Sequence, residues 1–200
     1  MNELLNHELK NLPAKYNSMK ILDYREEIWF VSGKFELDAS FDQVRIRESI
    51  LLQMEIPDSF PLIPPKIKEL GNRLSYFPHI NPDGYFCLGT PEVIGNALSQ
   101  STSLVSFLDK VLVSYLYCAF YYLKHNKEPF PCASHGFLGR LEEYCMIFNT
   151  NDPIIAYQFM NFVENGSELY SPCPCLSGKS LKDCHWQKIK EIRKMVTFNN

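Results

Sequence analysis

The sequence lacks the features expected of exported and membrane-spanning proteins. Met1 to Leu5 do not form a basic segment followed by a long apolar core, so no secretory signal is predicted. The longest uncharged apolar run near the middle of the chain, from Val111 to Leu123, has 13 residues, which is too few for a helix that spans a bilayer. We therefore expect a soluble protein in the cytoplasm.

An excess of charge of one sign is also missing. The net charge is −3, and acidic and basic residues are mixed along the chain. Surfaces that bind nucleic acid or anionic membranes need a cluster of basic residues, so we expect neither partner. A protein partner or a small ligand is the expectation instead.

The cysteines do not indicate a disulfide framework. Their number, seven, is odd, and without a secretory signal this favours reduced thiols. No Cys-x-x-Cys pair is present, which argues against a redox protein. The seven are Cys87, Cys118, Cys132, Cys145, Cys173, Cys175 and Cys184.

The composition and the periodicity predict an α+β fold. With 46% hydrophobic and 14% aromatic residues, the 200-residue chain can form one domain with a core and a small appendage. Apolar residues alternate most clearly over 44–56, as in a half-buried strand, and recur at helical spacing over 103–125. Further helices are predicted at about 1–10, 137–148 and 153–164, and further strands at 28–37, with an interruption near Gly33, and at 66–70.

One cysteine follows a tight turn. The turn formers Asn81 to Gly84 lead into a short apolar segment that contains Cys87, and His79 lies shortly before the turn. Such a turn can hold a thiol at the surface in a fixed orientation, where a nucleophile is useful. The alternative is an inert core cysteine, which is the usual role of a lone cysteine beside apolar residues.

This stretch resembles the active-site segment of ubiquitin-conjugating enzymes, in which a His-Pro-Asn tripeptide precedes the thioester-forming cysteine by ten residues. Ten residues before Cys87 stands Phe77, so Phe77-Pro78-His79 matches the tripeptide. The proline, Gly84 and the Cys87-Leu88 pair keep register. The resemblance covers roughly residues 1–135 and implies a ubiquitin-conjugating-like domain, an antiparallel sheet flanked by helices.

The resemblance also implies roles for residues. Cys87 would be the nucleophile, Phe77 and Pro78 would position the loop, and His79, in place of the family's asparagine, would organise the oxyanion. Glu128 stands where the family has an acidic residue that helps to deprotonate an incoming lysine, although a solvated loop charge is the alternative. The tryptophan that usually follows the cysteine is absent from 89–95, which resembles a remodelled loop.

The resemblance implies a protein partner. No phosphate-binding loop or dinucleotide fingerprint is present, so a separate activating enzyme or an already reactive acyl donor must supply the acyl group. The donor would be a protein with a free C-terminus, either a ubiquitin-like protein or a cGAS-like nucleotidyltransferase, as in bacterial anti-phage CBASS operons. The rival interpretation is a non-catalytic adaptor of the same fold that binds a protein partner.

A second motif lies near the C-terminus. Cys173, Cys175, Cys184 and His185 follow the order Cys-x-Cys-x8-Cys-His, which supplies three thiols and one imidazole for a tetrahedral zinc. The motif closely resembles the SEC-C motif. This chain has Leu176 where that motif usually has a glycine. With four protein ligands the zinc is expected to be structural.

The zinc motif completes the predicted domain organisation. We expect a catalytic domain over 1–135, a helical extension over 136–166 and a zinc element over 167–200. The helix predicted from Trp186 onward is basic, and this suggests either a docking surface for an acidic partner or a solvated face. Its basic residues are Lys188, Lys190, Arg193 and Lys194.

Overall fold

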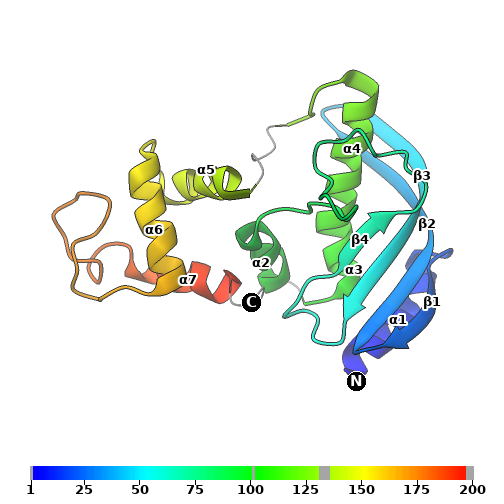
Figure 1. Cartoon of the computed structure of the whole chain (residues 1–200), viewed down its shortest axis with the longest axis horizontal. Coiled ribbons are helices and arrows are strands. Elements are labelled where there is room, and N and C mark those ends of the chain that lie inside the picture. The colour runs from blue at the N-terminus through cyan, green and yellow to red at the C-terminus, as the bar shows by residue number, and fades with distance from the viewer. Residues whose placement is uncertain (1, 101, 131–135, 197–200) are drawn as a thin grey trace. The chain divides into compact units, whose positions relative to one another are not determined.

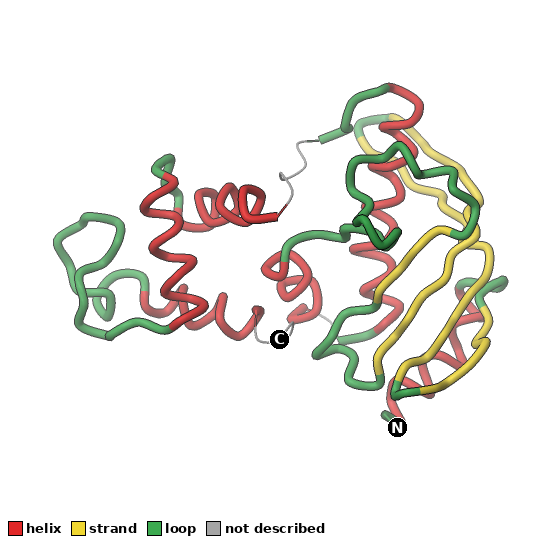
Figure 2. Tube along the Cα trace, in the orientation of Figure 1, coloured by secondary structure: helices red, strands yellow, loops and turns green. Residues whose placement is uncertain are grey.

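The computed structural model describes residues 2–100, 102–130 and 136–196 (Figure 1). Within these ranges the chain forms two compact units. The first unit comprises 2–88 and 96–130, and the second comprises 89–95 and 136–196. Cys132 lies outside the described residues. The α+β class is confirmed (Figure 2).

The first unit contains a four-stranded antiparallel sheet in the order β1-β2-β3-β4. Alternation predicted β3 well because its even positions from Ile46 to Ile56 are buried, apart from the half-buried Glu48. The strands are β1 (Lys20–Arg25), β2 (Ile28–Phe41), β3 (Val44–Pro57) and β4 (Lys66–Glu69).

Gly33 does not interrupt β2, contrary to the sequence prediction. The strand continues through this position, and a Cβ atom placed on Gly33 would lie 1.9 Å from the carbonyl oxygen of Ser18. Glycine is therefore needed because another segment of backbone passes against the strand at this point.

Helix α1 (Glu3–Lys15) precedes the sheet and is longer than predicted. It begins at the N-cap Asn2, whose side chain accepts a hydrogen bond from the amide of Leu5. Leu5, Leu9 and Leu12 form its buried face, whereas Leu4 is 82% exposed.

The central helix of the first unit runs without a break through α3 (Leu104–Phe107), η1 (Leu108–Leu112) and α4 (Val113–His125). It has 22 residues, and the helix predicted over 103–125 is confirmed. It is also long and apolar enough to cross a membrane, which the 13-residue apolar run did not indicate. However, 61% of its most apolar window is buried within the protein, and α4 contacts β2 and β3. This is the pattern of a core helix; the cytoplasmic location stays a prediction.

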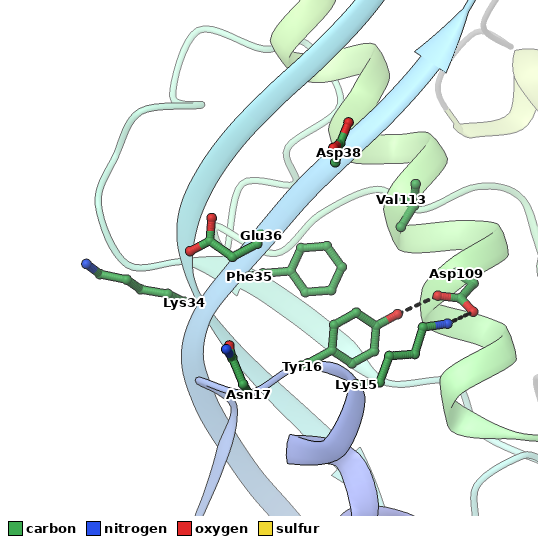
Figure 3. Close-up of a pocket in the computed structure, with 9 residues that line it drawn as sticks. All are labelled: Lys15, Tyr16, Asn17, Lys34, Phe35, Glu36, Asp38, Asp109 and Val113. Carbon is green, nitrogen blue, oxygen red and sulfur yellow. Dashed lines mark hydrogen bonds and ion pairs between the residues drawn. The ribbon is translucent and has the colours of Figure 1, made fainter.

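A pocket of about 260 Å³ lies between the end of α1, β2 and η1 (Figure 3). The hydroxyl of Tyr16 donates a hydrogen bond of 2.6 Å to Oδ1 of Asp109, which also pairs with Lys15. Burial and the carboxylate of Asp109 raise the pKa of Tyr16 well above its ordinary value. The charged groups satisfy one another, so these contacts connect α1 to η1.

The second unit is built from helices α5 (Gly136–Phe148), α6 (Pro153–Asn165) and α7 (Trp186–Val196). The predicted extension and the predicted zinc element share one hydrophobic core here, in which Phe148 and Phe159 stack with ring centroids 3.8 Å apart. Cys173, Leu181 and Ile189 are buried in the same core.

Helix α2 (Pro91–Gln100) corrects a second prediction, because the sequence was interpreted here as a loop. The boundary between the two units crosses this helix after Gly95, so its first turn belongs to the second unit. Its glycine and serine residues weaken the helical signal, and tertiary contacts of Glu92 with α5 compensate for this.

Candidate cysteine site and metal centre

The segment that contains Cys87 folds back on itself and joins the sheet. Phe86 donates its amide to the carbonyl of Ile67 in β4 at 2.8 Å. The turn closes with a 2.8 Å hydrogen bond from Gly84 to Asn81, and Gly84 has a φ of 84°, which favours glycine. Cys87 itself is half-buried.

The two arms of this segment place Cys87 opposite His79. The Cys87 amide donates to the His79 carbonyl at 2.9 Å, the Asn81 amide donates to the Tyr85 carbonyl at 2.8 Å, and Ile80 and Phe86 form an antiparallel bridge. Residues directly opposite in an antiparallel pair have their Cβ atoms about 4.5–5.5 Å apart on the same face. The backbones of Cys87 and His79 are therefore directly hydrogen-bonded, and the two residues lie opposite each other in this register.

The carboxylate of Glu128 contacts His79. Its Oε1 lies 3.2 Å from Nε2 of the imidazole, and 14% of the His79 side chain and 31% of the Glu128 side chain are exposed. The structure thus connects three sequence-predicted residues: Cys87 to His79 through the backbone, and His79 to Glu128 through side chains.

Tyr115 is a site residue that the sequence analysis missed. Its hydroxyl donates a 2.6 Å hydrogen bond to the carbonyl of His79. Burial raises the pKa of Tyr115 well above its ordinary value, and the nearby Cys87 adds to this effect. The helical periodicity places Tyr115 on the buried face of α4. The spacing alone does not distinguish Tyr115 from the other residues on that face.

Among the remaining loop residues, Phe77 has the clearest role. It is 3% exposed, and its ring lies 5.2 Å from that of His79 and 5.5 Å from that of Tyr115. It therefore supports the imidazole from one side. Pro78 and Gly84 are exposed and Leu88 is half-buried.

Four residues of the second unit form a compact cluster of potential metal ligands. One donor atom from each of Cys173, Cys175, Cys184 and His185 lies within 4.8 Å of all the others. Sγ of Cys175 is 3.4 Å from that of Cys173 and 3.5 Å from that of Cys184. Three sulfurs and one nitrogen at these separations suit tetrahedral coordination of a zinc ion.

The histidine presents Nδ1 to the sulfurs. This nitrogen lies 3.2 Å from Sγ of Cys173 and 3.3 Å from Sγ of Cys184. The His185 ring meets the rings of Phe148 and Phe159 edge to face, with centroids 5.6 and 5.0 Å apart. The two phenyl rings fix the plane of the imidazole, so a metal ion would be bound through Nδ1.

The thiols of the cluster favour a bound cation. Burial raises the pKa of Cys173 to about 12. Burial opposes ionisation of Cys175 as well, but hydrogen bonding with the side chain and backbone of Ser177 lowers the pKa of Cys175 to about 7. Thiolates this close together repel one another, so a positive charge between them favours full deprotonation.

The basic residues of α7 include two that cap other helices. Nζ of Lys188 donates to the carbonyl of Ile147 near the end of α5. The guanidinium of Arg193 donates to the carbonyls of Phe162, at 2.5 Å, and Val163, at 3.2 Å, near the end of α6. The prediction of a solvated basic face is therefore wrong for Lys188 and Arg193, because their side chains donate hydrogen bonds to backbone carbonyls at the ends of α5 and α6.

Comparison with known families identifies the second motif. The family model described as the SEC-C motif matches residues 171–187, which contain all four potential ligands. The comparisons with curated proteins and with solved structures found no match. SEC-C motifs bind zinc, and the cluster is compatible with a metal ion.

Proposed function

We propose that this protein is a ubiquitin-conjugating-like acyltransferase that carries an acyl group as a thioester on Cys87. The observation that carries the proposal is the placement of Cys87 opposite His79, with the Glu128 carboxylate 3.2 Å from the imidazole. A nucleophile, a base and a group that orients the base form the general arrangement of activated nucleophiles.

The order of elements supports the proposal. Helix α1 precedes a four-stranded antiparallel sheet, the cysteine segment follows β4, and the long helix ending with α4 packs on the sheet. The ubiquitin-conjugating fold has the same order. The helical second unit and α2 are additions to it.

The proposed reaction has two steps. The Cys87 sulfur attacks the carbonyl carbon of an activated C-terminal acyl group, a C–S bond forms, and the bond to the donor's leaving group breaks with its electron pair. His79 takes the thiol proton on Nδ1, because Nε2 faces Glu128, and the resulting N–H donates one hydrogen bond to the developing oxyanion. An amine of the acceptor then attacks the thioester carbonyl: a C–N bond forms, the C–S bond breaks, and Cys87 leaves as the thiolate with the electron pair. The proton lost from the amine nitrogen returns to this thiolate, which restores the thiol.

The contacts of Glu128 favour a role different from the one that the resemblance implied. A carboxylate hydrogen-bonded to an imidazole fixes the tautomer and orientation of the ring. Glu128 is therefore proposed to orient His79, and deprotonation of an incoming lysine becomes the second candidate role.

The proposed donor is a partner protein with a free C-terminus. A cGAS-like nucleotidyltransferase in bacterial anti-phage defence is the partner that the resemblance favours, and a ubiquitin-like protein is the other. A separate activating enzyme would supply the reactive acyl group. The SEC-C cluster would hold a structural zinc because all four coordination positions come from the protein.

The test is the intact mass of the protein after co-expression with its genomic neighbours, purified without reducing agent. A protein-sized adduct that is absent from Cys87→Ala and released by added thiol would identify the thioester and the donor. Cys145→Ala is the matched control, because Cys145 is also half-buried but lies outside both sites. No adduct, with biological activity preserved in Cys87→Ala, would instead support a non-catalytic adaptor.

A further inference from the structure

One side chain of the long helix contacts both arms of the cysteine segment, residues 77–87. The Tyr115 ring stacks on the Phe86 ring of the second arm, with centroids 4.6 Å apart and planes inclined by 23°. It also meets the Phe77 ring of the first arm edge to face, with centroids 5.5 Å apart. All three residues belong to the first unit, and all three are buried. Tyr115 therefore packs against the two arms at once.

The carbonyl oxygen of His79 joins the two arms to the helix. It accepts the amide of Cys87 at 2.9 Å and the hydroxyl of Tyr115 at 2.6 Å. A carbonyl oxygen has two lone pairs, so it can accept both donors. One donor belongs to the second arm and the other to α4, and together they fix the backbone that carries the imidazole.

The hydroxyl of Tyr115 is suited to this role because it keeps its proton. The residue is 8% exposed, and burial raises its pKa well above the ordinary value of about 10. A negative charge on Cys87 raises the pKa of Tyr115 further, so the two side chains lie close enough to interact electrostatically. Tyr115 therefore remains a hydrogen-bond donor both before and after the thiol ionises.

The two arms are attached to different elements of the first unit. The second arm is bound to the sheet, because the Phe86 amide donates a 2.8 Å hydrogen bond to the carbonyl of Ile67 in β4. The first arm is bound to α4, because its His79 carbonyl accepts the Tyr115 hydroxyl. Loss of that hydroxyl would allow the first arm to move relative to the sheet.

We propose that Tyr115 is a positioning residue for the reaction at Cys87. Its hydroxyl holds the His79 backbone, and Glu128 holds the imidazole, so that the ring stays in place to take the thiol proton. The chemical purpose of this positioning rests on the proposed thioester function, but the anchoring of the segment by Tyr115 does not.

The test removes a single oxygen atom. Tyr115→Phe deletes the hydroxyl and keeps the ring contacts with Phe77 and Phe86. The His79 carbonyl keeps its hydrogen bond from the Cys87 amide, so the substitution leaves no buried group without a partner and the variant should fold. Circular dichroism and urea unfolding check that it does.

Tyr117 provides a matched control on the same helix. It is 3% exposed, and its hydroxyl also donates to backbone carbonyls, those of Val44 at 3.0 Å and Phe41 at 3.3 Å, where β2 leads into β3. Tyr117→Phe therefore removes the same group from an equally buried position, but the bonds that it breaks lie outside the cysteine segment.

The first measurement is hydrogen exchange of single amides by NMR. The Cys87 amide should exchange roughly threefold to tenfold faster in Tyr115→Phe, which is the change in a local opening equilibrium expected from the loss of one hydrogen bond of ordinary strength. In Tyr117→Phe its exchange should stay within roughly twofold of the original, because the opening there is local to another part of the unit.

The second measurement is thioester formation in a single turnover, with the activated donor identified from the adduct mass. The maximal rate at saturating donor should fall roughly tenfold in Tyr115→Phe, because a displaced imidazole is less well aligned with the thiol. The donor concentration that gives half of this rate should stay within roughly twofold, because the hydroxyl that is lost is buried. A general loss of stability would not produce this division.

Each outcome decides the proposal. Unchanged exchange of the Cys87 amide in Tyr115→Phe, or an equal increase in Tyr117→Phe, would overturn it. Faster exchange with an unchanged maximal rate would also overturn it, because Tyr115 would then anchor the segment without serving the reaction. If the original protein forms no thioester, exchange that is faster only in Tyr115→Phe would leave the anchoring in place, and the acyltransfer function alone would fail.

Discussion

Glu128 and His79 form a carboxylate–imidazole pair, with Oε1 3.2 Å from Nε2, and the same histidine accepts the amide of Cys87 through its carbonyl. His79 therefore connects Cys87, the proposed nucleophile, with the carboxylate of Glu128, which lies 41 positions after Cys87 in the sequence. Tyr115 holds the histidine backbone from α4, so the imidazole is restrained from two sides.

The first prediction concerns Glu128. We expect Glu128→Ala to slow thioester formation on Cys87 by at least roughly tenfold, part of the 10²–10⁴ that a positioned acid–base group contributes. His79→Ala should have the larger effect because it removes the base itself. Single-turnover transfer from the activated donor measures both, and Lys127→Ala, an exposed neighbour, is the control. If Glu128→Ala leaves thioester formation unchanged and slows only transfer to lysine, Glu128 acts on the acceptor instead.

The second prediction concerns the metal. We expect about one zinc per chain by elemental analysis, mostly lost in Cys173→Ser/Cys184→Ser, because four protein ligands are needed for the closed site. Cys173 and Leu181 are buried with Phe148 and Phe159, so the thermal unfolding temperature should also fall. Cys145→Ser should retain the zinc. A variant that loses the metal without losing stability would show that the hydrophobic core alone holds the unit together.

The sequence predicted the elements whose own pattern is strong. Strand β3 alternates and is buried on one face, and α5 and α6 lie within one residue of the predicted bounds. Strand β1 was missed because all six of its residues are exposed, which leaves no alternation to detect. Helix α2 was missed because the contacts that stabilise it come from α5 and α7, far away in sequence.

The sites divide in the same way. The ligand cluster follows a local spacing, so the sequence was sufficient to name all four residues. The contact between Glu128 and His79 depends on the packing of two distant segments, which no local pattern specifies. Tyr115 contributes to the cysteine site through the hydrogen bond of its hydroxyl to His79. The helical pattern of α4 predicts only that Tyr115 is buried.

The third prediction concerns Leu176, which stands where SEC-C motifs usually have glycine. Its φ is 60° and its side chain is 79% exposed, so the residue has a left-handed backbone with little packing to compensate. This conformation costs about 1–2 kcal/mol for a residue other than glycine. We expect Leu176→Gly to raise the free energy of unfolding of the second unit by about 1 kcal/mol, after the greater flexibility of glycine in the unfolded chain is counted.

Gly178 provides the opposite control, since its φ is 76° and a Cβ there would meet no neighbouring atom. Gly178→Ala should therefore lower stability through backbone strain alone, by about 1 kcal/mol. Urea unfolding with zinc in excess measures both variants. A Leu176→Gly variant that is less stable than the original would mean that the leucine side chain makes a stabilising contact.

The fourth prediction concerns the pH dependence of stability through Glu143. Burial, reinforced by the negative charge of Glu92, raises the pKa of this carboxyl above its ordinary value, although the hydrogen bond from Thr90 opposes the shift. Just above the ordinary value of about 4.3, the unfolded chain has lost this proton while the folded protein keeps it. Unfolding therefore releases a proton, and the contribution of Glu143 to stability falls as the pH rises through the raised pKa.

Glu143→Gln should remove this part of the pH dependence, because glutamine resembles the neutral form at every pH. We expect the free energy of unfolding of the original protein, relative to the variant, to decline as the pH rises from the ordinary carboxyl pKa of about 4.3 through the raised pKa of Glu143. Comparison with the variant cancels the opposite trend from Asp38, Glu48, Asp58 and Asp109, whose pKa values are lowered. Glu168→Gln, at an exposed position, is the control and should follow the original protein. Parallel curves for the original and Glu143→Gln would mean that Glu143 ionises normally, and that water reaches the contact between Thr90 and α5.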